Sequence, residues 1–165
     1  MKYANKTDDL QFDVINRKLA IALGKQGKPQ QAYEYNIKSI KIIEQKIASN
    51  EIDKKRFEGR MADACLDASW YALILKKYAE AVALSNKGLK TAPTNLLLET
   101  NLAHGLLLSN RKIEAVKIYT RNIGKKMNDK QSWQDVVHED FTALRKAGIT
   151  SPEMKKVEKL LKTKQ

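Results

Sequence analysis

The chain has 165 residues, of which 42% are hydrophobic and 30% charged, and it contains only three prolines and seven glycines. This length and composition are typical of a single globular domain with a real core. So few turn-forming residues exclude a β-sandwich or barrel, which must turn every eight to twelve residues or so. Alanine, leucine, lysine and glutamate, all strong helix formers, dominate most stretches. We therefore expect an all-α protein.

The charge balance is strongly basic, with 31 basic against 19 acidic residues and a formal net charge of +12. Such an excess can attract nucleic acid, anionic lipid or an acidic protein. However, the lysines form short clusters spread along the chain, arginine is sparse, and the aromatic residues do not alternate with lysines as base-stacking platforms would. The pattern favours solvated helix faces, and nucleic-acid binding stays open as the alternative.

Targeting and redox signals are few. Cys65 is the only cysteine, so the chain cannot form an intramolecular disulfide. The N-terminal residues lack the apolar core of a signal peptide, and the longest apolar runs are far shorter than a membrane span. We expect a cytoplasmic protein with no membrane span. A longer parent protein with its own signal or upstream domain is the alternative that stays open.

Helical periodicity first appears over residues 8–23, where the pattern predicts a helix with a wide buried face. Its apolar positions are Leu10, Phe12, Val14, Ile15, Leu19, Ile21 and Leu23. Gly24 and Gly27 interrupt this pattern, and a proline suits the first turn of a second helix over 29–49. A long third helix is expected over about 52–75.

The rest of the chain continues with short turns between helical segments. Five further helices are expected, over residues 76–92, 95–110, 111–124, 132–147 and 150–162. Ser132 can cap the helix over 132–147, and Gly148 can end it. Its apolar face is made by Trp133, Val136, Val137, Phe141 and Leu144. The prediction is a succession of antiparallel helix pairs.

These helix pairs repeat in sequence. Ala81 in "YAEAV" recurs as Ala115 in "KIEAV", which sets a period of about 34 residues. The interval from Ala32 to Ala81 is longer, and its surplus fits roughly two more turns on each of two helices. Ser69 and Ala103, on the preceding helices, are as far apart as Ala81 and Ala115. Small residues at such positions let two helices cross at about 8 to 10 Å.

The repeat resembles the tetratricopeptide repeat family. That family pairs a small residue on the first helix with an alanine on the second, opens the second helix with an aromatic residue and closes the unit with a proline. The three copies hold these places with Ala20, Gly27 and Ala32, then Ser69, Tyr78, Ala81 and Pro93, then Ala103 and Ala115. The chain departs from the family at Asn16, Cys65 and Glu99, where a large aromatic is common, and at Lys112, which replaces the aromatic supplied by Tyr78.

The resemblance implies a particular architecture. Antiparallel helix pairs should stack as a short right-handed superhelix, with three pairs over about residues 8–125 and longer helices in the first. Residues 131–162 resemble the C-terminal capping helices of a bacterial tetratricopeptide module, which cover the apolar face of the last repeat. Residues 1–7 and 163–165 are expected to be flexible.

The resemblance also implies a binding site, because the first helices of such pairs line a concave groove that holds a peptide or helix of a partner. It places nine residues on or near the groove: Arg17, Ile21, Asp63, Leu66, Trp70, Leu73, Thr100, His104 and Leu107. Trp70 among apolar neighbours suggests an anchor for an apolar side chain. The alternative is that Trp70 is buried by its neighbours or by the C-terminal helices.

The sequence offers no convincing catalytic set. His104 and Cys65 could form a base–nucleophile pair, but no third group orients the histidine and no oxyanion loop is evident. His138 lies beside two acidic residues, but adjacent residues on a helix point in different directions and cannot chelate one ion together. We expect a non-enzymatic interaction module or scaffold without catalytic residues, metal or cofactor. The alternative is a basic helical-repeat protein that binds nucleic acid through surface lysines.

Overall fold

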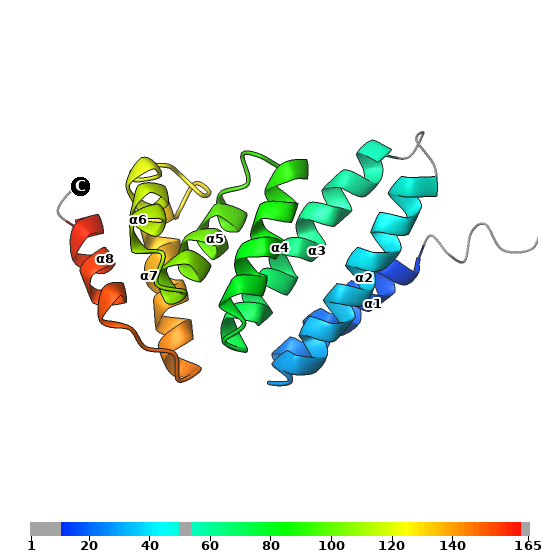
Figure 1. The fold of residues 1–165 in the computed structure, drawn as a ribbon, viewed down its shortest axis with the longest axis horizontal. Helices are drawn as coiled ribbons and strands as arrows, with labels where there is room; N and C mark the ends of the chain where they lie inside the picture. The colour runs from blue at the N-terminus through cyan, green and yellow to red at the C-terminus, as the bar shows by residue number, and fades with distance from the viewer. Residues whose placement is uncertain (1–10, 50–53, 163–165) are drawn as a thin grey trace, which may run out of the picture.

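The computed structural model describes residues 11–49 and 54–162, and within them it contains eight α-helices and no strand (Figure 1). The helices are α1 (Phe12–Lys25), α2 (Pro29–Ser49), α3 (Lys54–Ile74), α4 (Tyr78–Thr91), α5 (Leu96–Leu108), α6 (Lys112–Arg121), α7 (Trp133–Lys146) and α8 (Pro152–Lys162). The all-α prediction is confirmed. The ends that we expected to be flexible lie outside the described residues, as does the predicted start of the third helix.

The helix ends follow from local sequence signals. At the start of α7, Ser132 Oγ accepts a hydrogen bond from the backbone of Asp135, whose carboxylate accepts one from the backbone of Ser132 at 2.8 Å. At its end, Gly148 has a φ of +74°, a conformation that side chains disfavour. The next residue, Ile149, donates to the carbonyl of Leu144 and closes the helix. Both predicted signals are confirmed.

The helices pack mostly against their neighbours in the chain. From α1 to α6 each helix contacts the next, and α3 also contacts α5. In Figure 1 these helices follow one another along the row, with α1 largely behind α2. The last pair follows at the far end, where α8 packs on α6 and α7 lies behind α5 and α6 in this view. The final pair therefore covers the end of the row rather than standing apart from it.

The repeat seen in the sequence recurs in the backbone. The turns inside the first three pairs each place one residue at positive φ: Gly27 at 71°, Lys76 at 61° and Asn110 at 65°. These positions are spaced along the chain as Ala32, Ala81 and Ala115 are. In each turn the following N–H bonds back to a helix carbonyl, as Lys28 to Leu23, Lys77 to Ala72 and Arg111 to Leu106. One turn geometry is used three times.

The small residues that the repeat places within its helices lie at helix contacts. Six of them are 0% exposed: Ala20, Ala32, Ser69, Ala81, Ala103 and Ala115. Their burial agrees with the close helix crossings expected from the sequence. The right-handed superhelical path itself stays a prediction.

The predicted buried face of the first helix is wrong. Phe12, Ile15, Leu19 and Ile21 are 37–50% exposed, and Val14 and Leu23 are partly buried. The buried positions are instead Asp13 and Ala20. The Asp13 carboxylate pairs with Arg60 of α3 at 3.2 Å, and its backbone carbonyl accepts from Ser39 of α2. As the first helix of the row, α1 packs mainly on one neighbour, α2, so it cannot bury apolar residues that surround most of its circumference.

Candidate functional site

A surface hollow lies between α3, α5 and α7, and we call it the α3 groove. It is lined by Leu66, Asp67, Trp70, Tyr71, Leu97, Asn101 and Asp140. Trp70 is partly buried and packs on the main core cluster, while Leu97 on α5 is 42% exposed. The hollow thus offers aromatic and apolar side chains to a partner. Two of the nine predicted groove residues, Leu66 and Trp70, meet here.

Two of the residues that line the α3 groove are carboxylates, Asp67 from α3 and Asp140 from α7. Arg17 of α1 reaches across to α3, where its guanidinium contacts Asp67 at 2.7 Å and the nearby Asp63 at 2.9 Å. Burial raises the pKa of Asp67, and the Arg17 guanidinium opposes that shift. The charged residues that line the groove are therefore acidic in a chain whose net charge is +12.

A second hollow adjoins the groove over α1, α2 and α3. It contains Arg17 and Ile21 together with Asp13, Val14, Lys18, Ser39, Ile43 and Arg60. Thus five predicted residues are at least partly accessible, namely Arg17, Ile21, Asp63, Leu66 and Trp70. Their role in binding a partner stays a prediction.

The other four predicted groove residues are buried. Leu73, Thr100 and His104 are 0% exposed and Leu107 is 3% exposed. The first helix of the third pair is covered by α7, because Trp133 Nε1 donates to Thr100 Oγ1 at 2.9 Å and the Phe141 ring packs 4.9 Å from the His104 ring. A partner cannot contact Thr100 or His104 while α7 is in place.

His104 connects three helices. Its Nδ1 lies 2.7 Å from Tyr119 Oη on α6, and its Nε2 lies 3.2 Å from Asp140 Oδ2 on α7. Burial raises the pKa of Tyr119 well above its usual value, so the phenol stays protonated. With both ring nitrogens engaged inside the core, His104 holds α5, α6 and α7 together.

Cys65 lies in a different buried cluster from His104 and contacts Met61, with 3.8 Å between the two sulfur atoms. Burial raises the pKa of Cys65 to about 12, so the reactive thiolate is scarce near neutral pH. Neither group is presented to solvent as a catalytic pair requires. The geometry supports packing roles for both.

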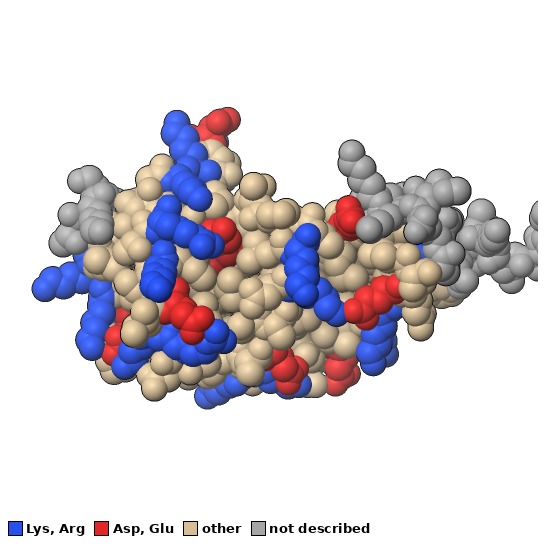
Figure 2. Space-filling model, turned by 45° about the horizontal axis from the view of Figure 1, so that its top comes forward, with Lys and Arg blue, Asp and Glu red and all other residues tan. Residues whose placement is uncertain are grey.

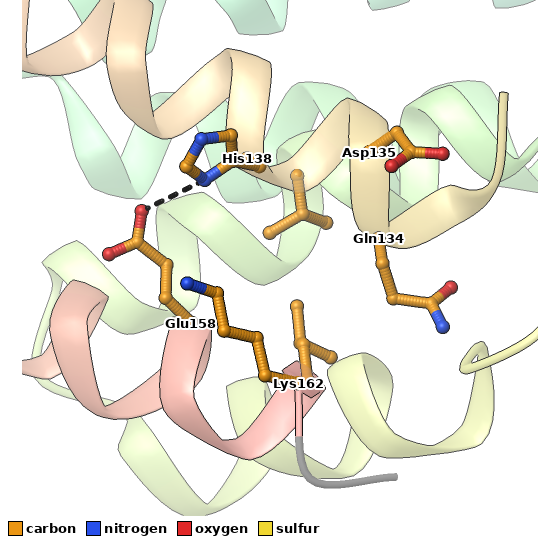
Figure 3. Close-up of a pocket in the computed structure, with 7 residues that line it drawn as sticks. Gln134, Asp135, His138, Glu158 and Lys162 are labelled. Carbon is orange, nitrogen blue, oxygen red and sulfur yellow. Dashed lines mark ion pairs between the residues drawn. The ribbon is translucent and has the colours of Figure 1, made fainter. Parts of the chain in front are cut away.

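A pocket between α7 and α8, lined by both polar and apolar side chains, was not predicted from the sequence (Figure 3). His138 Nδ1 and Glu158 Oε1 point toward each other at 3.4 Å. Arg145 donates two hydrogen bonds to the same carboxylate, at 2.9 and 2.7 Å, and thereby lowers the pKa of Glu158. These charges join α7 to α8, and the pocket residues include no cysteine, serine or threonine nucleophile.

The three adjacent polar residues of α7 have separate partners. His138 faces Glu158, Glu139 accepts from Gln131 at 2.9 Å, and Asp140 faces His104. Their divergence is the one expected for neighbours on a helix. Over residues 11–49 and 54–162 no cluster of three potential metal ligands is found. No helix in that part of the chain combines the length and apolar character needed to cross a membrane.

Several groove residues escaped the sequence-based assignment. Leu97 and Asn101 lie on the same side of α5 as the predicted Thr100 and His104, at helical spacing, so the pattern could have included them. Asp140 gave no such signal, since only the return of α7 onto α5 brings it there.

No family model, no curated protein and no solved structure matches the chain.

Proposed function

We propose that this protein is a non-enzymatic interaction module of the tetratricopeptide repeat kind, which holds a peptide or helix of a partner protein in the α3 groove. The repeated turns and the six buried small residues support the family assignment. One observation carries the binding role: the partly exposed Trp70 lines a hollow together with apolar and acidic side chains. Half-buried aromatic residues in concave sites are common binding anchors.

The lining of the groove defines the chemistry of the partner. Trp70, Leu66 and Leu97 favour an apolar side chain. Among residues 11–49 and 54–162, Asp67 and Asp140 make their contacts with Arg17 and His104 through Oδ2, so Oδ1 of each can accept a hydrogen bond from a partner. A segment with an apolar residue flanked by lysine or arginine fits these features best.

The packing of α7 provides an internal example of this mode. Position 104 follows position 70 by one repeat spacing, the one that joins Ala81 to Ala115, so His104 on α5 and Trp70 on α3 are equivalent. At α5 the place is filled by a helix of the chain itself, which seats Phe141 against His104. A partner helix or peptide at α3 would extend the same arrangement by one repeat.

A peptide-library selection against the full chain tests the proposal. Enriched peptides should combine an apolar residue with neighbouring basic residues. Trp70→Ala and Asp67→Asn should each weaken their binding, by at least about tenfold for the tryptophan. Ile113→Ala, at a 76% exposed position on α6, is the matched control and should bind normally. Unchanged binding by the Trp70 variant would show that the groove is assigned wrongly.

The second candidate, nucleic-acid binding, rests on the net charge of +12. On the face in Figure 2 the basic residues are separated by acidic and uncharged ones, and several lysines are paired, such as Lys112 with Glu153 and Lys87 with Glu44. Fluorescence anisotropy with a labelled oligonucleotide separates the two functions. Phosphate-driven binding should be strong at low salt and fall steeply as salt rises, whereas the interaction module should show none at micromolar concentration.

A further inference from the structure

One face of α1 carries an exposed apolar row, which we call the α1 stripe: Phe12, Ile15, Leu19 and Ala22. The spacing of three, four and three residues puts all four side chains on one side of the helix. Phe12, Ile15 and Leu19 are 50, 44 and 42% exposed, and Ala22 is exposed as well. Three large apolar side chains in line on a helix are more than the scattered exposure that surfaces normally show.

The repeat register shows what this row corresponds to. Two repeat spacings later, Leu98, Leu102 and Gly105 of α5 stand in the places of Ile15, Leu19 and Ala22. All three are buried, and they form the side of α5 that packs on α4.

The contacts of that side are close. A Cβ atom on Gly88 of α4 would come within 2.8 Å of Leu98, and one on Gly105 would come within 2.9 Å of Val82 of α4. Leu102, which lies between Leu98 and Gly105 on α5, is only 8% exposed. The equivalent positions on α5 therefore make a tight helix-packing surface.

The middle pair shows the same correspondence. One repeat spacing after Phe12, Ile15 and Leu19 stand Met61, Ala64 and Ala68 of α3. They are at most 4% exposed and belong to the buried cluster that includes Ile40 and Ile43 of α2. The surface through which α3 and α5 pack on the preceding helix pair is thus present on α1, where no other helix of the described residues covers it.

We propose that the α1 stripe is the interface between two copies of this chain, packed α1 against α1 about a two-fold axis. The stripe continues the packing surface that two other first helices already use. An antiparallel crossing centred between Ile15 and Leu19 sets Phe12 of each copy over Ala22 of the other. The large and small ends of the stripe then complement each other, as a two-fold interface requires.

The opposite end of the row, formed by α8, does not suit head-to-tail stacking, in which α8 of one copy would pack on the α1 stripe of the next. The exposed residues of α8 include Lys155, Lys156 and Lys159, while its apolar residues Met154 and Val157 are buried against the rest of the chain. Burying these lysines against an apolar stripe would strip their charges of water, and the stripe offers them no acceptor. The α1 stripe of a second copy, which carries no charged residue, is a better partner for the stripe than α8 is.

Sedimentation velocity on the full chain, from about 1 to about 500 μM, tests this proposal, because an interface of one helix per copy is small and should dissociate in this range. The weight-average mass should rise from one chain toward two. Leu19→Glu and Ala22→Glu should each raise the dissociation constant at least tenfold. Both positions are exposed within one copy, so the fold should survive, as circular dichroism would verify. Ile113→Glu on α6 is the matched control and should dimerise normally.

Three outcomes would overturn the proposal. The chain could stay monomeric throughout the range, or both stripe variants could dimerise as well as the unmodified chain. A helix of another protein could also saturate the stripe while this chain stays monomeric. None of these outcomes bears on the α3 groove, because the stripe residues do not line it.

Discussion

Two equivalent helices of this molecule have different surroundings, and the difference separates a core from a binding groove. On α5, His104 is fully buried beneath Phe141 of α7. On α3 the equivalent residue, Trp70, is partly exposed and lines a hollow. The same face of a repeated helix pair is structural where a later helix returns onto it and is available where none does. Function in this chain is therefore expected at α3 and stability at α5.

The largest expected effect on stability comes from comparing the two tryptophans of the chain, one in each region. Trp133→Ala removes a side chain that is 0% exposed and should reduce the free energy of unfolding by about 3 to 5 kcal/mol. Trp70→Ala removes one that is only partly buried and should cost roughly 1 to 2 kcal/mol, since less of it leaves water on folding. Urea denaturation of both variants measures the difference. Equal losses would contradict the assignment of core and groove.

The buried hydrogen bonds of His104 provide a smaller effect. His104→Leu should destabilise the protein by about 1 to 3 kcal/mol, because Tyr119 Oη and Asp140 each lose their partner on α5. Combining it with Tyr119→Phe should cost less than the sum of the two single changes, since the second change removes the hydroxyl left unpaired by the first. A double-mutant cycle in urea measures this coupling. Strict additivity would mean that the three helices are not joined through the imidazole.

The smallest effect concerns the ion pair that joins α7 to α8. Arg145 lowers the pKa of Glu158, so the pair stabilises the fold fully above the unfolded pKa of a glutamate, about 4.3. This stability is lost as the pH falls through the lower folded pKa. Arg145→Gln should therefore cost about 0.5 to 1 kcal/mol at pH 7 and progressively less below pH of about 4. Urea midpoints across pH measure the trend, and a cost that is constant with pH would contradict it.

Much of the fold could be predicted from the sequence because its signals are local. The capping box at Ser132, the positive φ at Gly148 and the apolar face of α7 depend on residues a few positions apart. The sequence repeat was visible because buried helix crossings demand small side chains at fixed places, such as Ala81 and Ala115. Signals of this kind need no knowledge of the rest of the chain.

The two failures share a cause, which is that periodicity does not reveal what covers a helix. The apolar positions of α1 predicted burial, yet Phe12 and Leu19 are exposed because α1 is the first helix of the row. Conversely, Thr100 and His104 were predicted to line a groove, yet α7 returns over them. Both outcomes depend on contacts between segments that are distant in sequence.

Fluorescence of single-tryptophan variants tests the central claim most directly. Trp133→Phe leaves Trp70 as the only tryptophan, and Trp70→Phe leaves Trp133. Without a ligand, acrylamide should quench Trp70 readily and Trp133 hardly at all, in line with their exposure. Adding a peptide from the library selection should protect Trp70 and leave Trp133 unchanged. A peptide that binds without altering the quenching of Trp70, or that alters Trp133 instead, would contradict the account.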